Sequence, residues 1–155
     1  MTLVVYVGGA RSGKSTLAVE RARVEGAPAT FIATGEAGDE EMAERIARHN
    51  AERPTGWTTI EEPVDVAGAL ASVSETETVI VDCLSLWVAN GGDGAVPAPR
   101  GGLTIAVTNE VGLGIVPVNA LARAYRDTLG RVNAAWVAAS DEAYFVVAGR
   151  TLRLV

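Results

Sequence analysis

Residues 3–15 read LVVYVGGARSGKS, an apolar run at 3–7 followed by the pattern G-x-x-x-x-G-K-S at 8–15. The apolar run is rich in β-branched residues and stops at Gly8, as expected of a strand that is buried on both faces of a parallel sheet. The pattern that follows is the P-loop motif, which holds nucleotide phosphates when it lies between a strand and a helix. A glycine turn that only leads into a helix is the structural alternative. We expect a nucleotide-binding protein.

The P-loop motif (residues 8–15) supplies the groups that a triphosphate requires. Its glycines let the backbone approach an anion closely, and its N–H groups and the following helix dipole face the phosphates. Lys14 is the only lysine beside twelve arginines, and its compact ammonium can reach between the β- and γ-phosphates. The residues that we expect to bind nucleotide here are Gly8, Gly9, Ala10, Arg11, Ser12, Gly13, Lys14 and Ser15, with Lys14 also acting in catalysis.

Apolar strands alternate with helices along the rest of the chain. We expect strands at 30–33, 58–60, 79–81 and 103–108, helices at 14–25, 39–53, 65–73, 84–89 and 118–139, and a terminal hairpin of 144–148 and 152–154. This order predicts an α/β fold: a single P-loop NTPase-like domain over residues 1–155, with a mostly parallel sheet, helices on both faces and a C-terminal hairpin. Segment 91–102 is so rich in Gly and Pro that we expect a flexible loop that does not pack.

Polar residues follow several of these strands, and ligands bind at the carboxyl ends of the strands in such sheets. Thr34-Gly35, Asp82 and Asn109-Glu110 are therefore expected to line the site together with the P-loop motif. Asp82 stands where P-loop proteins place a carboxylate near the metal ion, although strands also end in Asp when it caps a helix. We predict Ser15 and Asp82 as the ligands of Mg²⁺.

The single histidine of the chain, His49, falls in the helix expected at 39–53. Met42, Ile46, His49 and Asn50 would share one face of that helix, which we expect to turn inward. Taken alone, a helical histidine is more often a structural residue than a catalyst. An imidazole is largely neutral at pH 7, however, and is then available as a nucleophile or a base.

Composition argues against several classes of protein. A net charge of −6 opposes binding to a phosphate backbone, so nucleic acid is not an expected partner. The chain has neither an apolar run of roughly 20 residues nor a signal-like N-terminus, so we expect a cytoplasmic protein without a membrane span. With one cysteine and one histidine it lacks a zinc or iron cluster, and Mg²⁺ bound with nucleotide is the expected cofactor. The guanine-reading pattern N-K-x-D of regulatory GTPases is also missing.

Further blocks of sequence carry a more specific resemblance. They are IAT at 32–34, RIARH at 45–49 with RP at 53–54, DCL at 82–84 and NEVGLGIVP at 109–117. Together with the P-loop motif and in this order, they resemble the bifunctional adenosylcobinamide kinase/adenosylcobinamide-phosphate guanylyltransferase family of cobalamin biosynthesis. The resemblance covers nearly the whole chain, and the block at 109–117 is far more specific to the family than the P-loop motif.

The resemblance implies two reactions. ATP or GTP phosphorylates the aminopropanol hydroxyl of adenosylcobinamide, and GMP then passes from GTP through a guanylyl-histidine to adenosylcobinamide phosphate, giving adenosylcobinamide-GDP. By its place in R-I-x-x-H-x-x-x-R-P, the histidine is His49. The resemblance also implies a trimeric homo-oligomer. Further nucleotide contacts that it implies are Ala33, Thr34, Gly35, Asn50, Ala51, Glu52, Arg53, Asp82 and one residue of the pair Glu61-Glu62, here assigned to Glu61.

Two other readings of the chain stay open at this point. One is a P-loop kinase of small molecules in which His49 is incidental, and the other is a nucleotide-binding module without catalysis. The choice between ATP and GTP as phosphate donor and the general base of the kinase step also stay open. Family members carry a longer, helical segment where this chain has residues 91–102. We expect the fold to survive, whereas a subunit contact or a wall of the corrinoid site is in question.

Overall fold

The computed structural model describes residues 2–155, and its elements follow the order expected from the sequence. The strands are β1 (Thr2–Gly8), β2 (Thr30–Ala33), β3 (Thr58–Glu61), β4 (Val79–Asp82), β5 (Leu103–Asn109), β6 (Glu142–Val147) and β7 (Arg150–Arg153). The helices are α1 (Lys14–Arg23), α2 (Glu40–Glu52), α3 (Val66–Ser72), α4 (Leu84–Ala89) and α5 (Ala120–Ala139).

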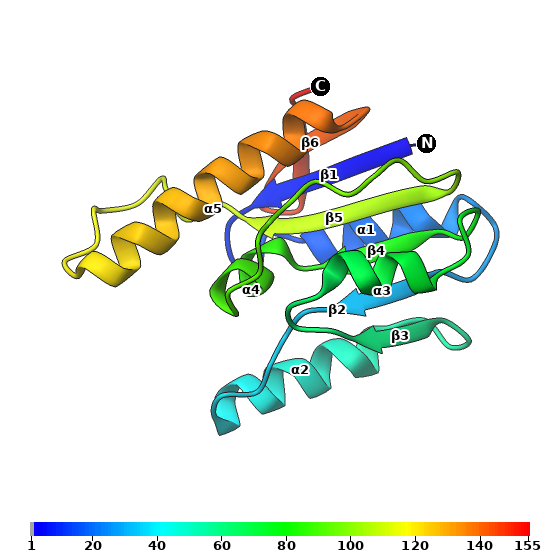
Figure 1. Cartoon of the computed structure of the whole chain (residues 1–155), viewed down its shortest axis with the longest axis horizontal. Coiled ribbons are helices and arrows are strands. Elements are labelled where there is room, and N and C mark those ends of the chain that lie inside the picture. Colours follow the sequence, from blue (N-terminus) through cyan, green and yellow to red (C-terminus); the bar gives the residue numbers. More distant parts are fainter. Residues whose placement is uncertain (1) are drawn as a thin grey trace.

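All of these strands join one sheet in the order β3-β2-β4-β5-β1-β6-β7 (Figure 1). Every pairing is parallel except that of β6 with β7, which is antiparallel. The predicted α/β fold with a mostly parallel sheet and a C-terminal hairpin is therefore confirmed. Because β1 lies between β5 and β6, the P-loop motif leaves from the interior of the sheet rather than from its edge.

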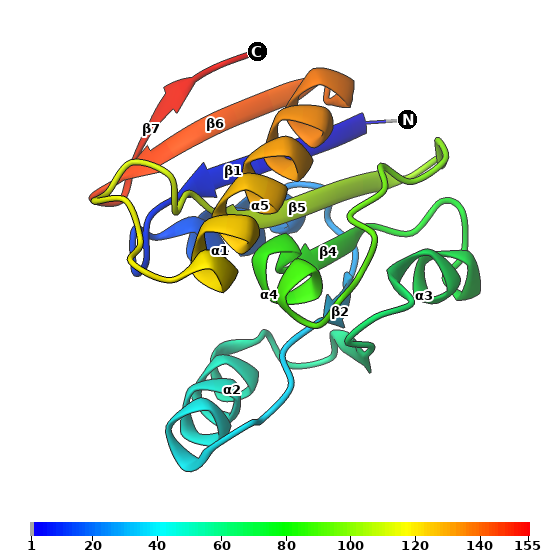
Figure 2. The same cartoon turned by 60° about the vertical axis from the view of Figure 1, so that its left-hand side comes forward.

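Two apolar layers cover the faces of the sheet. Leu3, Val5 and Val7 of β1 pack in the layer that also contains buried residues of α3, α4 and α5. Val4 and Tyr6 point the other way, into the layer that contains buried residues of α1. Figure 2 shows α1 behind the sheet and α5 in front of it. The alternation along β1 thus follows the pleat of a strand that is buried on both sides, with helices on both faces as predicted.

Polar side chains fix where three of the helices begin. Asp39, Asp65 and Asn119 accept hydrogen bonds from backbone N–H groups of the first turn in α2, α3 and α5. The expected helix starts at 39, 65 and 118 therefore lie one or two residues too early, because an N-cap residue is not itself helical. No helix among the described residues is long and apolar enough to span a membrane.

Segment 91–102 contains no helix or strand, as expected, but the expectation that it does not pack is wrong. Trp136 donates a hydrogen bond to the carbonyl of Gly94 at 2.9 Å, and a side chain on Gly94 would collide with Val132. The buried Arg100 donates to the carbonyls of Ser74 and Glu77. Glycine lets the backbone approach α5 closely, so the composition that suggested mobility instead permits this contact. The flexibility of the segment stays a prediction.

Helix α2 is placed differently from the other helices, beyond the β3 edge of the sheet (Figure 1). It contains no buried residue, and Met42, Ile46 and His49 are only partly covered. Met42, Ile46 and His49 turn inward as expected, but toward a cavity rather than the apolar core, and Asn50 is exposed.

Candidate active site

A cavity of about 430 Å³ lies at the carboxyl ends of the strands, between the P-loop motif and α2. Its lining comes from the start of α1, the ends of β2, β3 and β4, and one face of α2. The expected site residues that line it are Arg11, Ser12, Gly13, Lys14, Ser15, Ala33, Gly35, His49, Glu52, Arg53, Glu61 and Asp82. The fold therefore brings the P-loop motif, the histidine and the carboxylate of β4 around one space.

Other expected site residues do not line the cavity: Gly8, Gly9, Ala10, Thr34, Asn50, Ala51 and Glu110. Lining residues that the sequence analysis did not single out for the site are Thr16, Met42, Arg45, Ile46, Arg48, Cys83, Leu86 and Val107. Helical spacing from His49 was the signal available for Met42, Arg45 and Ile46, since residues three, four and seven apart share a helix face. The cavity also includes Asn109, in line with its expected place after a strand.

The P-loop motif is held in shape from the C-terminal hairpin. A side chain on Gly8 would collide with the carbonyl of Val146 in β6, so this position requires glycine. The N–H of Gly149, in the hairpin turn, donates to the carbonyl of Ser12 at 2.7 Å. The ammonium of Lys14 folds back to the carbonyl of Gly9 at 2.5 Å. Burial lowers the pKa of Lys14, with the charges of Cys83 and Asp82 acting in the opposite direction.

His49 and Asp82 face each other across the cavity. Nδ1 of His49 lies 4.0 Å from Oδ2 of Asp82, with 40% of the histidine side chain exposed but only 14% of the aspartate side chain. Burial raises the pKa of Asp82, and nearby His49, Arg53 and Lys14 offset this only in part. The site thus contains an accessible imidazole beside a carboxylate that the fold has largely removed from water.

Thr34 positions the ends of two strands from beneath the cavity. Its hydroxyl donates to the carbonyl of Cys83 at 2.7 Å and accepts from the N–H of Cys83 at 2.9 Å. Its own N–H donates to the carbonyl of Asp82, while its carbonyl accepts from the side chain of Asn90 at 2.7 Å. These bonds join the ends of β2 and β4, so Thr34 fixes the backbone that carries Asp82.

A second, smaller cavity of about 180 Å³ lies between α1 and α2, and His49, Arg53 and Asp82 line both spaces. The guanidinium of Arg53 lies 4.7 Å from the ring centroid of Phe31 and donates to Oγ1 of Thr59 at 3.1 Å. The cation–π contact and the hydrogen bond hold Arg53 between the two cavities. The imidazole is therefore reachable from both cavities.

The two adjacent glutamates differ in their surroundings. Glu61 is the last residue of β3 and lines the cavity. Glu62 instead accepts a hydrogen bond from the N–H of Asp65 at 2.7 Å, in the turn that leads to α3. Glu61 is thus the member of the pair with access to a ligand.

The residues of the site suit Mg²⁺ that arrives with a nucleotide. Mg²⁺ commonly takes one or two protein oxygen ligands and completes its shell with phosphate oxygens and water. The hydroxyl of Ser15 and the carboxylate of Asp82 line both cavities and supply such oxygens. Within residues 2–155 there is no cluster of three or more His, Cys, Asp or Glu that could hold a metal without a nucleotide.

Comparison with known proteins agrees with this arrangement. The family model "Cobinamide kinase / cobinamide phosphate guanyltransferase" matches residues 3–95 and 95–154, divided at a point inside segment 91–102. The "Bifunctional adenosylcobalamin biosynthesis protein CobP" of Pseudomonas aeruginosa is 41% identical over 165 residues, which cover 97% of this chain and 95% of that protein. The "Bifunctional adenosylcobalamin biosynthesis protein CobU" of Escherichia coli is 36% identical over 175 residues, which cover 95% and 96%. The chain belongs to the cobinamide kinase / cobinamide phosphate guanyltransferase family.

Proposed function

We propose that this protein first phosphorylates the aminopropanol hydroxyl of adenosylcobinamide and then transfers GMP from GTP to the phosphorylated product. The observation that carries the proposal is the shared cavity, in which the only histidine of the chain stands beside Asp82 and the P-loop motif. A kinase alone needs the P-loop motif but has no use for an imidazole on the opposite wall. Membership of the family supports the same pair of reactions.

In the kinase step, the substrate hydroxyl attacks the γ-phosphorus of ATP or GTP. Backbone N–H groups of the P-loop motif and the ammonium of Lys14 bind the phosphates, where negative charge spreads during transfer. Ser15 and Asp82 hold Mg²⁺, which neutralises phosphate charge when it is bound. A loose transition state of this kind needs little help from a general base.

In the transfer step, His49 acts as the nucleophile. Nδ1 keeps its proton beside Asp82, and the lone pair of Nε2 forms a bond to the α-phosphorus of GTP. The bond from the α-phosphorus to the bridging oxygen breaks, and its electron pair leaves with pyrophosphate. A phosphate oxygen of adenosylcobinamide phosphate then attacks the same phosphorus and releases the imidazole, giving adenosylcobinamide-GDP.

The remaining nucleotide contacts are proposed by position. Ala33, Gly35, Glu52, Arg53 and Glu61 line the cavity and are available to the ribose and base of GTP. Thr34 serves by holding the strand ends together. Asn50 and Ala51, on the exposed side of α2, would reach the nucleotide only after a local rearrangement.

We also propose that the protein assembles as a homo-oligomer, a trimer, in the cytoplasm. The support is a run of exposed apolar side chains between β5 and the start of α5: Val111, Leu113, Ile115, Val116, Val118 and Leu121. Contiguous exposed apolar surface of this kind marks an interaction site more often than ordinary surface.

The experiment that tests the proposed function is the intact mass of the protein after incubation with Mg²⁺ and GTP. Wild type should gain the mass of one GMP, and His49→Ala should gain none. Phosphorylation of adenosylcobinamide, followed separately, should persist in His49→Ala and fall about 10²-fold or more in Lys14→Ala.

This experiment tests the kinase step and the guanylyl transfer step separately. Phosphorylation without an adduct in wild type would identify a kinase without guanylyl transfer. Nucleotide binding without either product would identify a binding module. An adduct that survives His49→Ala would move the nucleophile to another residue.

A further inference from the structure

The cavity is lined by more cationic side chains than the proposed reactions have been given roles for. Although the chain has a net charge of −6, the cations lining the cavity outnumber the carboxylates: Arg11, Lys14, Arg45, Arg48 and Arg53 against Glu52, Glu61 and Asp82. Lys14 and Arg53 have hydrogen-bond partners. Within residues 2–155, Arg11, Arg45 and Arg48 make no hydrogen bond or ion pair, so their guanidinium groups are available to a ligand.

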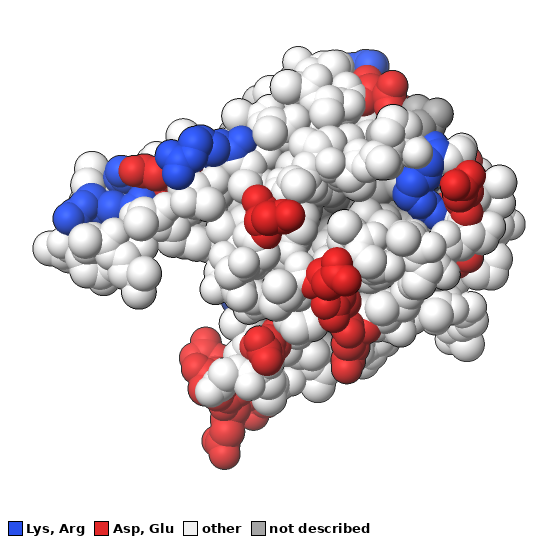
Figure 3. Space-filling view, in the orientation of Figure 1, with Lys and Arg blue, Asp and Glu red and all other residues white. Residues whose placement is uncertain are grey.

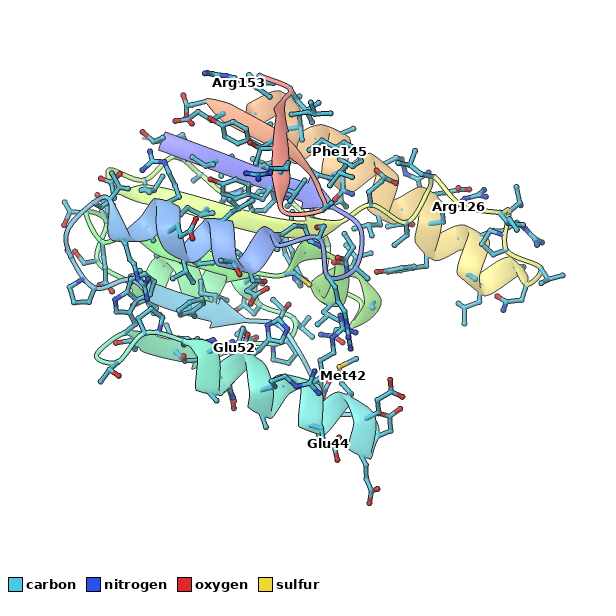
Figure 4. All side chains as sticks on the ribbon, turned by 180° about the vertical axis from the view of Figure 1, so that it is seen from behind. Met42, Glu44, Glu52, Arg126, Phe145 and Arg153 are labelled. Atoms are coloured by element: carbon cyan, nitrogen blue, oxygen red, sulfur yellow. The ribbon has the colours of Figure 1, made fainter. Side chains whose placement is uncertain are left out.

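The acidic and basic side chains of helix α2 lie mostly on different sides of the helix. Figure 3 shows acidic side chains gathered over the outside of α2, and the sequence of the helix places Glu40, Glu41 and Glu44 in its first half. Its two arginines, Arg45 and Arg48, line the cavity instead. In Figure 4, Met42 points from α2 toward the P-loop motif, whereas Glu44 points away from it. Glu52 of α2 also lines the cavity, but the two arginines outnumber it, so the cavity side of the helix has a net positive charge, as a site for phosphates requires.

Arg45 lies on the Met42 side of the helix and one turn before His49. Side chains four residues apart on a helix have Cβ atoms about 5–6 Å from each other on the same face. Arg45 and Lys14 also line the same cavity. Arg45 is thus next to the nucleophile on one side and near the phosphate-binding lysine on the other.

This spacing matches the phosphate chain of a nucleotide. When Nε2 of His49 stands at the α-phosphorus, the β- and γ-phosphates extend away from it into the cavity that Arg45 and Lys14 line. A cation one turn along the same face therefore lies beside these two phosphates. Arginine suits this place because its planar guanidinium can donate to two phosphate oxygens at once.

We propose that Arg45 binds the β- and γ-phosphates of GTP from α2, opposite Lys14, and neutralises the pyrophosphate that leaves when His49 attacks. The inference rests on the proposed guanylyl transfer and assigns its leaving-group site. One bond forms, from Nε2 to the α-phosphorus, and one breaks, from the α-phosphorus to the oxygen bridging to the β-phosphate. The departing oxygen takes the electron pair and becomes negatively charged. Arg45 and Lys14 lie on opposite sides of this oxygen.

The test uses the exchange of labelled pyrophosphate into GTP, which reports His49 guanylylation and its reversal without any cobinamide. Arg45→Ala should lower the maximal exchange rate about 10²-fold, the usual cost of losing one donor to a developing anion, and raise the pyrophosphate concentration needed for half-maximal exchange. Arg45→Lys, which keeps the charge but not the planar donor pair, should restore part of the rate. Arg45 is exposed, so all variants should melt within about 2 °C of wild type.

Arg153→Ala is the matched control, because it removes the same charge from an exposed position of β7 that does not line the cavity. Its loss of exchange should be less than about tenfold. Equal losses in Arg45→Ala and Arg153→Ala would show a general charge effect and overturn the assignment, as would exchange in Arg45→Ala within about threefold of wild type. No exchange in wild type would instead remove the transfer step itself, and the Arg45 assignment with it.

Discussion

The carboxylate of Asp82 is the most constrained charge of the site. It sits at the end of β4 with 14% of its side chain exposed, held by the bonds from Thr34 to the backbone around it. Burial raises its pKa, which means that folding disfavours its ionised form. The nucleotide-free protein therefore loses stability by keeping this charge at the proposed Mg²⁺ site.

Asp82→Asn should therefore have opposite effects on stability and on activity. Because the folded-state pKa lies above the ordinary value of 3.8, stability is lost as pH rises from that value through the folded pKa. At pH 7, without nucleotide, Asp82→Asn should raise Tm by about 2–4 °C, the shift that about 1 kcal/mol gives in a chain of this size. Adduct formation with GTP should fall about 10²-fold or more. Thermal melting from pH 3 to 8 checks the first effect.

The gain in Tm should disappear as the pH falls toward 3, below the ordinary pKa of 3.8, where the carboxyl is protonated in both the folded and the unfolded chain. A gain that is the same at all pH values would mean that packing rather than charge is responsible. A loss of Tm at pH 7 would contradict the argument, because it would make the ionised carboxylate a net stabilising group in the free protein.

At the residue scale, the sequence predicts the site residues that belong to short sequence patterns. Lys14 and Ser15 belong to one contiguous motif, and Asp82 follows an apolar strand, so local pattern is enough to place them. The sequence alone does not distinguish Glu61 from Glu62. In the structure, Glu62 accepts a hydrogen bond from Asp65 outside β3, whereas Glu61 lines the cavity. Arg45 shares a helix face with His49 in the sequence, but only the cavity shows what that face meets.

At the element scale, segment 91–102 shows how composition and contact differ. Gly and Pro predict the absence of a helix or strand, because they disfavour both kinds of backbone. They do not predict whether a neighbour supplies a donor, and Trp136 of α5 supplies one to Gly94. Gly94 has φ +68° and touches Val132, whereas Gly91 has φ +88° and open space where a side chain would be.

These two glycines allow a matched test of the packing of the segment. Alanine at either position carries the strain of positive φ, about 1–2 kcal/mol. Gly94→Ala should lower the free energy of unfolding by a further 1–3 kcal/mol or so, because its methyl group collides with Val132. Denaturant unfolding of both variants measures the difference. Equal losses would mean that the segment moves away from α5 at no cost.

At the scale of the whole molecule, α5 and the loop before it project beyond the sheet (Figure 1). The sequence predicts strands, helices and a parallel sheet, because alternating apolar elements leave few other arrangements. It does not predict that β1 lies between β5 and β6, since strand order depends on the direction in which each connection crosses the sheet. Nor does it show that Ile115 and Val118, 97% and 99% exposed, lie outside the core.

The exposed apolar loop gives the prediction at this scale. If it forms the contact between copies, the double variant Ile115→Glu, Val118→Glu should shift the mass measured by light scattering from trimer to monomer, because buried carboxylates are costly at an interface. Val24→Glu, which adds charge at a valine that is 78% exposed after α1, should leave the trimer intact.

Monomeric wild type would contradict the proposed assembly, and a trimeric double variant would place the contact elsewhere. Circular dichroism of each variant separates loss of assembly from loss of fold. Segment 91–102 lies on the core side of α5, so its length should not affect this contact.

The position of β1 also has a consequence for how the protein is made. The ribosome synthesises β1 and the P-loop motif long before either neighbour of β1, since β5 begins at Leu103 and β6 at Glu142. The N–H group that holds Ser12 belongs to Gly149 and is made later still. A nascent chain therefore lacks both neighbours of β1 and the donor from Gly149 until almost all of its sequence has left the exit tunnel, and we expect its phosphate site to be complete only then.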